Sequence, residues 1–259
     1  MEYALITGAT KGIGKAFAKK LASENKNLIL VARSEDLLKE LKESLELKFN
    51  VDIVIFRIDL SKLDEVNSLI KELDDYEIDM LINNAGFGGY KAFADHDLPF
   101  NRDMEVTHNT SVIMLTHNIL NKFKMKNKGI VLTVSSIVGF GAFPNLGIYC
   151  ATKAFLNIFM ETIYLENLGS NINIKCLCPG FVSSSFYDGI DIDKSLLKNK
   201  GVLRWMTPDE VVGYTIKNIN KNKVILIPGI LNKFLYVLLT RMPKKLYYKI
   251  ANKNWEYLK

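Results

Sequence analysis

The chain has 259 residues, of which 48% are hydrophobic and 24% charged, a composition that suits one large folded domain and excludes a disordered or fibrous protein. The net charge of +6 is confined to residues 232–259, which hold seven basic side chains and one acid. Residues 1–231 hold equal numbers of both signs (34 − 7 = 27 basic and 28 − 1 = 27 acidic). We therefore expect no general nucleic-acid-binding surface.

Short apolar segments alternate with amphipathic ones along the chain. Segments rich in Ile, Leu and Val predict strands covered on both faces of a parallel sheet, at residues 3–7, 27–32, 52–57, 79–82, 129–134, 173–178 and 224–228. Amphipathic segments predict helices from Ile13, which shares a stripe with Phe17 and Leu21, and at 35–48, 62–74, about 104–125, 149–168 and 208–221. Repeated β-α-β units predict an α/β fold, a single Rossmann-type doubly wound parallel sheet of about seven strands flanked by helices on both faces.

The domain organisation follows from the same pattern. Residues 1–231 form one predicted domain that includes a loop at 181–206, and residues 232–259 form a basic, apolar helical extension of it. The three cysteines are sparse and lack metal-ligand spacing, so we expect a reduced protein without a metal. A strand that starts at residue 3 leaves no room for a signal sequence, and no uncharged apolar segment approaches the ~20 residues of a membrane span. We expect a cytoplasmic protein.

A glycine-rich loop, TGATKGIG (7–14), follows the first predicted strand and opens the first helix. Gly8 permits a tight turn, Gly12 lets the backbone approach a pyrophosphate, and Gly14 lets helix and strand pack closely. The helix N-terminus then offers free N–H groups and a positive dipole to the phosphates. This pattern predicts a dinucleotide site, with an ordinary structural turn as the alternative.

The end of the second predicted strand indicates which dinucleotide is bound. A cofactor with a free ribose 2′-hydroxyl usually meets an acid there, but this chain has Ala32 followed by Arg33. An arginine suits a 2′-phosphate, and Lys11 in the glycine loop could add a second cation. The residues favour NADP(H), against the alternative of a solvated arginine at a helix start.

The segment GIYCATKAF (147–155) places Tyr149 four residues before Lys153, so both side chains share one face of a predicted helix. A phenol normally titrates near pH ~10, and a neighbouring cation lowers that pKa. The pair could therefore exchange a proton near neutral pH, although YxxxK alone also occurs on ordinary exposed helices.

The motifs together resemble the short-chain dehydrogenase/reductase family in its compact form. They occur in the family's order over nearly the whole chain, as TGATKGIG (7–14), DL (59–60), NNAG (83–86), VSS (134–136), YCATK (149–153) and PGFV (179–182). The glycine spacing is GxxxGxG, unlike the GxxGxxG of the longer, epimerase-like branch. The stretches TSVIMLT and PGFVSSSF are similar to the part of the family that contains hydroxysteroid dehydrogenases and 3-ketoacyl reductases.

The resemblance implies a catalytic trio of Ser136, Tyr149 and Lys153. Ser136 would stabilise the substrate oxygen, Tyr149 would act as general acid or base, and Lys153 would lower the pKa of the phenol and hold the nicotinamide ribose. The implied cofactor-binding residues are Gly8, Thr10, Lys11, Gly12, Ile13, Gly14, Arg33, Asp59, Leu60, Asn83, Ala85, Gly86, Tyr149, Lys153, Pro179, Gly180, Val182 and Ser184. Asp59 and Leu60 would contact the adenine, and Asn83 would also brace the sheet.

One position departs from the family pattern. The family's fourth catalytic residue is an asparagine, and its position falls on His108, with Asn109 adjacent. Either the helix is shifted by one residue or His108 replaces the asparagine. Because the family role is largely that of a backbone carbonyl, we expect His108→Asn to retain activity.

The sequence leaves the substrate and the tail open. Aromatic loop residues suggest an apolar substrate, or else simply pack their loops: Phe87, Phe140, Phe143, Phe186 and Tyr187. The resemblance implies that this substrate is an acyl or steroid-like carbonyl compound. Residues 232–259 could pack on their own domain, pack on a neighbouring subunit, or touch a membrane surface. The resemblance implies a homo-oligomer, either a dimer or a tetramer. The predicted function is reversible NADP(H)-dependent carbonyl reduction, with a non-catalytic NADP-binding sensor or scaffold as the alternative.

Overall fold

Seven parallel strands form one sheet in the computed structural model, which describes residues 1–183 and 205–256. The strands within these residues are β1 (Glu2–Thr7), β2 (Asn27–Ala32), β3 (Ile53–Arg57), β4 (Glu77–Asn83), β5 (Gly129–Val134), β6 (Ile172–Leu177) and β7 (Ile225–Leu226). Their order is β3-β2-β1-β4-β5-β6-β7, so the predicted doubly wound α/β sheet is confirmed. The winding reverses between β1 and β4, and ligands of such sheets bind in the crevice beyond the carboxyl ends at that point.

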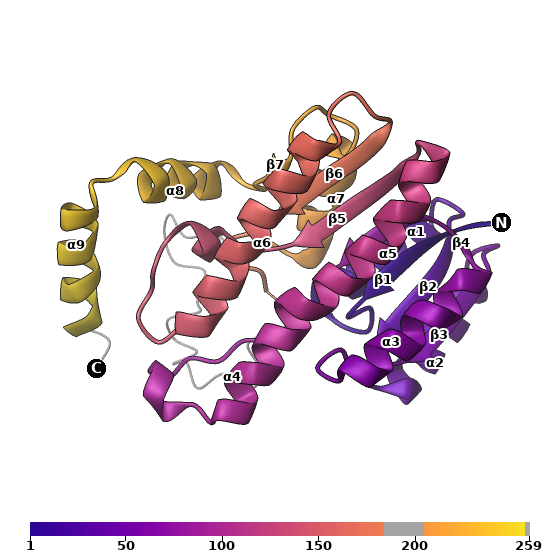
Figure 1. Ribbon diagram of the computed structural model, residues 1–259, viewed down its shortest axis with the longest axis horizontal. Helices are drawn as coiled ribbons and strands as arrows, with labels where there is room; N and C mark the ends of the chain where they lie inside the picture. Colours follow the sequence, from indigo (N-terminus) through magenta and orange to yellow (C-terminus); the bar gives the residue numbers. More distant parts are fainter. Residues whose placement is uncertain (184–204, 257–259) are drawn as a thin grey trace.

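Helices cover both faces of the sheet (Figure 1). They are α1 (Gly12–Ala22), α2 (Glu35–Glu46), α3 (Leu63–Glu72), α4 (Leu98–Glu105), α5 (Ser111–Lys126), α6 (Gly147–Glu166), α7 (Pro208–Asn218), α8 (Ile230–Arg241) and α9 (Lys244–Glu256). Short 3-10 turns lie at η1 (Leu73–Asp75), η2 (Phe93–Asp95) and η4 (Ile137–Phe140), and a π-helical turn at η3 (Val106–Thr110). The predicted helix near 104–125 is therefore interrupted by a π turn at its start.

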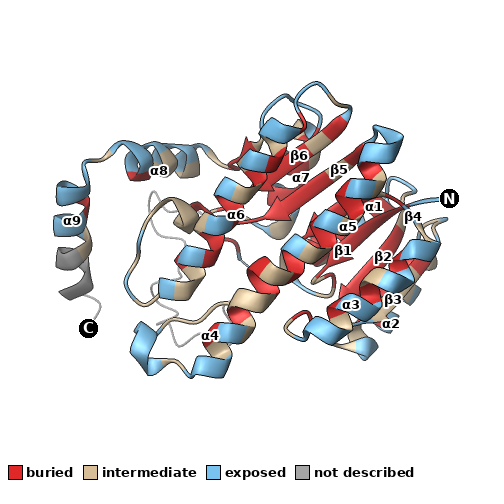
Figure 2. Cartoon of the chain, in the orientation of Figure 1, coloured by how far each residue is buried: buried red, intermediate tan, exposed pale blue. Residues whose placement is uncertain are grey.

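The strands alternate their side chains between two separate apolar layers. Leu5 points into the layer under α3, α5 and α6, whereas Ala4 and Ile6 point into the layer under α1, α2 and α7. Both layers are buried, as the red strands of Figure 2 show. This double burial explains why the strands are continuous apolar segments in the sequence.

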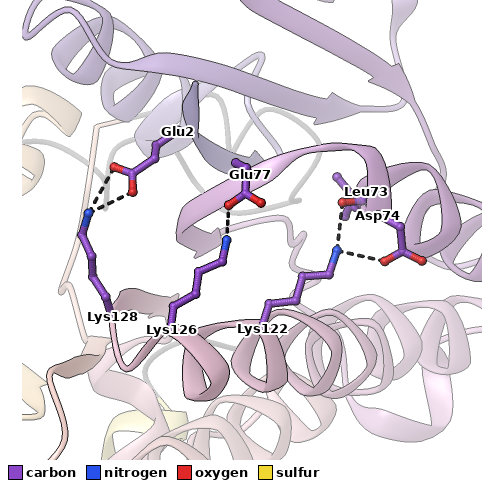
Figure 3. A network of polar contacts seen from close by, with 7 residues as sticks. All are labelled: Glu2, Leu73, Asp74, Glu77, Lys122, Lys126 and Lys128. Atoms are coloured by element: carbon purple, nitrogen blue, oxygen red, sulfur yellow. Dashed lines mark hydrogen bonds and ion pairs between the residues drawn. The ribbon is translucent and has the colours of Figure 1, made fainter.

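Three lysines on and after α5 bind residues near the amino ends of the strands (Figure 3). Lys122 Nζ lies 2.9 Å from Asp74 Oδ1 and donates to the Leu73 carbonyl oxygen at 3.0 Å. Lys126 pairs with Glu77, and Lys128 Nζ lies 2.9 Å from Glu2 Oε1. These largely exposed pairs are screened by water, so they orient α5 more than they stabilise it. They also lie at the edge opposite the carboxyl ends of the strands.

The C-terminal helices form an arm at the end of the molecule opposite β3 and α2 (Figure 1). The predicted helical extension is thus two helices, α8 and α9, with Pro243 between them. A proline lacks a backbone N–H and disfavours helical conformation in the residue before it. No helix in the described part of the chain is both long and apolar enough to cross a bilayer.

Candidate active site

The glycine loop at the carboxyl end of β1 packs so closely against its neighbours that it leaves no space for side chains at two of its glycines. Gly8 has φ +64°, and a Cβ added there would lie 2.8 Å from Ala85 Cα. A Cβ on Gly14 would lie 2.3 Å from the Gly8 carbonyl oxygen. Gly12 also has a positive φ, of 52°. A side chain at Gly8 or Gly14 would therefore displace the loop, whose shape depends on the absence of Cβ atoms.

Asn84 and Thr7 hold this loop, and sequence reasoning missed both of them. Asn84 Nδ2 donates to the carbonyl oxygens of Thr7 at 2.9 Å and Gly8 at 3.2 Å. In return, Thr7 Oγ1 accepts from the backbone N–H groups of Asn84 at 2.9 Å and Ala85 at 3.0 Å. These four bonds couple the ends of β1 and β4, the two strands on either side of the crevice. The signal available in the sequence was the second asparagine of the NNAG motif.

The neighbouring Asn83 has a different structural role. Its side chain is buried, and its Nδ2 donates to Thr116 Oγ1 at 3.0 Å and Thr133 Oγ1 at 3.2 Å. Asn83 therefore joins β4 to α5 and β5, which braces the sheet below the site. A direct contact between its side chain and a cofactor stays a prediction.

The start of α1 fits a dinucleotide phosphate. Lys11 occupies the N-cap position with extended backbone and, among the described residues, no side chain caps this helix end. The first turn contains no acid, so the N–H groups and the positive dipole face the crevice without competition. Thr10 and Ile13 are half-buried in the same loop.

Two of the residues predicted to bind the cofactor lie at the carboxyl ends of β2 and β3. Arg33 is exposed directly after β2, and its charge acts on Asp59 beyond β3. Partial burial would raise the pKa of Asp59, but hydrogen bonds from Ser61 and the charges of Arg33 and Lys62 outweigh it and lower that pKa. Leu60 is buried beside it in the core. The cation and its carboxylate neighbour leave this end of the crevice without a net negative charge.

Lys153 is a buried cation at the carboxyl end of β5. Its side chain is only 5% exposed, and Nζ donates to the Val134 carbonyl oxygen at 3.0 Å. Burial lowers the pKa of Lys153 from 10.5 to about 8. Nζ also lies 5.7 Å from the centroid of the Tyr149 ring, so the ammonium and the phenol of the YxxxK motif share one location.

The two serines of the VSS motif have different roles in positioning. Ser135 Oγ donates to the Lys153 carbonyl oxygen at 3.0 Å, which fixes α6 to the end of β5. Ser136 is 8% exposed and caps η4, with Oγ accepting from the Val138 N–H at 3.3 Å. Because Lys153 reaches Val134, the helix that carries Tyr149 packs directly on the strand end that carries Ser136. The structure thus gathers the three predicted catalytic residues at one edge of β5.

A shallow recess, open to solvent, adjoins Tyr149. Its lining mixes apolar and polar side chains, among them Lys91, Phe93, His96, Met104 and Ile148. Tyr149 itself is half-buried.

The predicted aromatic substrate wall is divided by the structure. Phe87 packs against Phe100 at 5.3 Å between ring centroids. Phe140 and Phe143 instead contact the C-terminal arm, through Tyr236 at 4.7 Å and Tyr247 at 6.5 Å. Phe186, Tyr187 and the predicted cofactor residue Ser184 lie outside the described residues.

His108 links the segment after β4 to the helix that carries Tyr149. Its Nε2 accepts from the Phe87 N–H at 3.1 Å, and its Nδ1 lies 2.9 Å from Thr152 Oγ1. Thr152 Oγ1 in turn donates to the Tyr149 carbonyl oxygen at 2.9 Å. Since Nε2 is an acceptor, Nδ1 carries the proton and the imidazole is neutral. Complete burial and the charge of Lys153 agree with this, because both hold the pKa of His108 well below 6.5.

The imidazole of His108 contacts the Tyr149 ring, at 5.7 Å between centroids. His108 and Asn109 both lie in the π turn η3, and such turns are frequent at functional sites. Gly86 makes room for the imidazole, since a Cβ there would lie 2.8 Å from Nε2. The Asn109 side chain is buried, and its Oδ1 has no hydrogen-bond partner within the described part of the chain.

We expect His108→Asn to retain turnover within about tenfold, because the amide nitrogen of asparagine can occupy the position of Nδ1 and still donate to Thr152.

The same substitution should make the stability of the folded protein less sensitive to acid. Folding lowers the pKa of His108, so the unfolded chain binds its proton more tightly and wild-type stability falls as the pH drops below 6.5. Thermal unfolding at pH 5 and pH 7.5 should show a smaller loss for the variant than for wild type. An identical loss in both proteins would contradict this assignment of a neutral imidazole.

The segment after β6 completes the crevice. The Pro179 carbonyl oxygen accepts from the Ile137 N–H at 3.0 Å, directly after Ser136. Val182 is buried and forms a bridge with Met206. A Cβ on Gly180 would lie 2.2 Å from Asn232 Oδ1, at the start of α8. Pro179 thus lies beside the segment that follows Ser136, and the nicotinamide contacts of Pro179, Gly180 and Val182 stay a prediction.

Comparison with known proteins identifies relatives of this arrangement. A family model described as short chain dehydrogenase matches residues 2–194. A very-long-chain 3-oxoacyl-CoA reductase-A from Danio rerio is 34% identical over 187 residues, which is 71% of this chain and 59% of that protein. An NADP-dependent 3-hydroxy acid dehydrogenase from Schizosaccharomyces pombe is 34% identical over 186 residues, 70% of this chain and 72% of that protein. The match thus spans about three fifths of the first relative's length.

Solved structures share the fold over nearly the whole chain. A 7β-hydroxysteroid dehydrogenase matches with a TM-score of 0.86 at 22% identity, covering 97% of this chain and 96% of that one. A short-chain dehydrogenase from Sphingobium yanoikuyae in complex with NADPH matches with a TM-score of 0.82 at 24% identity, over 94% and 96%. One from Burkholderia phymatum in complex with NAD matches with a TM-score of 0.79 at 22% identity, over 92% of each chain. At these identities the likeness shows the fold alone.

Proposed function

The chain belongs to the short-chain dehydrogenase family of oxidoreductases, and from that membership we propose that it interconverts a ketone or aldehyde and the corresponding alcohol with NADP(H) as cofactor. The observation that carries the proposal is the position of Lys153. Its buried ammonium is held at the end of β5, one helical turn from Tyr149 and beside the strand end that carries Ser136. Burial of a charge costs free energy, which the bond to Val134 offsets only in part, so a buried lysine at this place is consistent with a functional role.

The residues of this chain suit proton transfer at a carbonyl oxygen. The cofactor, when bound, supplies or accepts the hydride. In reduction, the Tyr149 hydroxyl would donate its proton to the oxygen, and the Ser136 hydroxyl would donate a hydrogen bond to the same atom. The Lys153 ammonium favours the phenolate that remains, since an opposite charge nearby stabilises the charged form. In oxidation the same groups act in reverse, with Tyr149 as the base.

Support for an apolar substrate comes from the relatives. The first relatives include reductases of very-long-chain 3-oxoacyl-CoA, and the region matched by the family model contains the whole predicted catalytic trio. We propose an acyl or steroid-like carbonyl compound for this chain. The test is NADPH oxidation by the purified protein against 3-oxoacyl thioesters of increasing chain length, bulky ketones and short water-soluble ketones. Turnover that rises with the apolar size of the substrate supports the proposal, and turnover of short ketones alone contradicts it.

The cofactor preference depends on Arg33. We expect Arg33→Asp to weaken NADPH binding by about 10- to 100-fold, because a charge-assisted hydrogen bond to the 2′-phosphate contributes about 1.5–3 kcal/mol. NADH binding should change little, since it lacks that phosphate. Fluorescence titration of both cofactors measures the effect, with Arg57→Asp, one strand further out, as the charge-matched control. Equal weakening of both cofactors would remove Arg33 from this role.

A further inference from the structure

The C-terminal arm, defined as α8 and α9, carries large apolar side chains that are exposed in the described part of the chain. One side of α8 packs on the body, where Tyr236 meets Phe140 and Leu239 is buried. The other side carries large exposed side chains, with Ile230 84%, Phe234 69% and Val237 53% exposed. These three residues follow helical spacing and form one outward stripe, which Leu231 and Leu238 widen. An exposed apolar stripe of this kind is typical of an interaction surface.

Helix α9 also carries an exposed apolar stripe, and lysines lie beside it. Leu246 and Ile250 are four residues apart on one face and are 49% and 42% exposed. Lys245 and Lys249, also four apart and exposed, lie along the neighbouring stripe. Tyr248 is 59% exposed nearby. Apolar stripes flanked by lysines and aromatic rings are typical of helices that lie in a membrane interface.

The charge of the arm identifies the chemistry of its partner. Residues 232–259 hold the entire net charge of +6, whereas the rest of the chain is neutral overall. Among the described residues, no ion pair joins a cation of the arm to a carboxylate. Two copies meeting through this arm would bring like charges together. An anionic surface complements it instead, and anionic lipid attracts each Lys or Arg near a bilayer.

We propose that the outward faces of α8 and α9 bind an anionic phospholipid surface, and that this binding holds the catalytic crevice at the membrane. The connection between arm and crevice is direct. The Tyr247 hydroxyl donates to the Ala142 carbonyl oxygen at 2.5 Å, and Tyr236 packs on Phe140. Both partners lie between Ser136 and Tyr149, so the segment that follows Ser136 packs on the membrane-binding helices. The proposal concerns binding alone and stands whether or not the carbonyl chemistry is correct.

Flotation of the full chain with vesicles tests this. The chain should float with phosphatidylcholine vesicles that contain about one third phosphatidylserine, and not with phosphatidylcholine alone at the same salt concentration. Binding should weaken as salt rises, because the basic side chains act through screened charge. The double variant Phe234→Asn, Val237→Asn should lose about tenfold or more of this binding, since two large apolar side chains leave the interface.

The matched control is Leu47→Asn, Met125→Asn, which alters two exposed apolar residues of the body, 91% and 80% exposed. It should bind vesicles like wild type. Both variants should keep wild-type thermal stability and NADPH affinity, because none of the four side chains lies in the crevice. If wild type does not float with anionic vesicles, or if the arm variant floats as well as the control, the proposal is wrong. A mass measurement that shows a dimer lost in the arm variant, with flotation unchanged, would instead assign this face to a second copy.

Discussion

Replacing Tyr149 with phenylalanine is expected to reduce turnover of any carbonyl substrate by about 10³-fold or more, while NADPH binds nearly as well as before. The change removes the hydroxyl that donates the proton, and general acid catalysis alone contributes about 10²–10⁴-fold. It leaves the ring in place, and with it the contacts to His108 and Lys153. Initial rates of NADPH oxidation and fluorescence titration of NADPH measure the two quantities separately.

Tyr164→Phe is the matched control for this experiment. Tyr164 lies on the same helix, and its hydroxyl bonds to Asn222 away from the crevice. Wild-type turnover is expected from this variant. Turnover that persists in Tyr149→Phe would remove the phenol from the mechanism. A wild-type protein that binds NADPH tightly but turns over none of the carbonyl panel would favour the alternative of a non-catalytic NADP-binding sensor.

Replacing Lys153 with methionine is expected to lower turnover by about 10²–10⁴-fold without lowering stability at pH 7. Burial lowers the pKa of Lys153 from 10.5 to about 8, so holding it charged at pH 7 costs about 3 kcal/mol of folding free energy. The substitution removes that cost. It also leaves the Val134 carbonyl oxygen without its donor, which costs about 1–3 kcal/mol. The two effects nearly cancel, which separates a loss of activity from a loss of fold.

The pH dependence of stability provides a second readout. Between about pH 8 and 10.5 the unfolded chain holds the Lys153 proton more tightly than the folded protein does, so wild-type stability rises with pH through this range. Lys153→Met should lack that rise and become less stable than wild type at the upper end. Denaturant unfolding of the cofactor-free proteins at several pH values measures the difference. Parallel stability curves for the two proteins would show that Lys153 does not titrate in this way.

Lys175→Met serves as the matched control for Lys153. Lys175 is also buried, and burial also lowers its pKa, but its Nζ donates to the carbonyl oxygens of Lys221 at 2.5 Å and Lys223 at 3.1 Å. Those carbonyls cap the segment that leads into β7. This variant should change stability and leave turnover per folded molecule unaltered. Equal losses of turnover in both lysine variants would indicate a structural role for Lys153.

The strands and most helices could be predicted because each depends on a local pattern. The expected helix at 35–48 is α2 (Glu35–Glu46), and the expected strand at 27–32 is β2 (Asn27–Ala32). The expected helix near 104–125 is less regular, because the π turn η3 inserts an extra residue around His108. That insertion has no local signature, since it depends on contacts with Phe87 and Thr152.

The sequence by itself determined the sheet type, the glycine loop and the pairing of Tyr149 with Lys153, because strand periodicity, turn chemistry and helical spacing act over a few neighbouring residues. Tertiary structure alone decided which groups hold these parts in place. The bond from Asn84 to the Thr7 carbonyl joins residues 77 positions apart, that from His108 to Thr152 spans 44, and that from Tyr247 to Ala142 spans 105. Such partners meet only once the whole sheet has assembled, so no short segment of the chain encodes them.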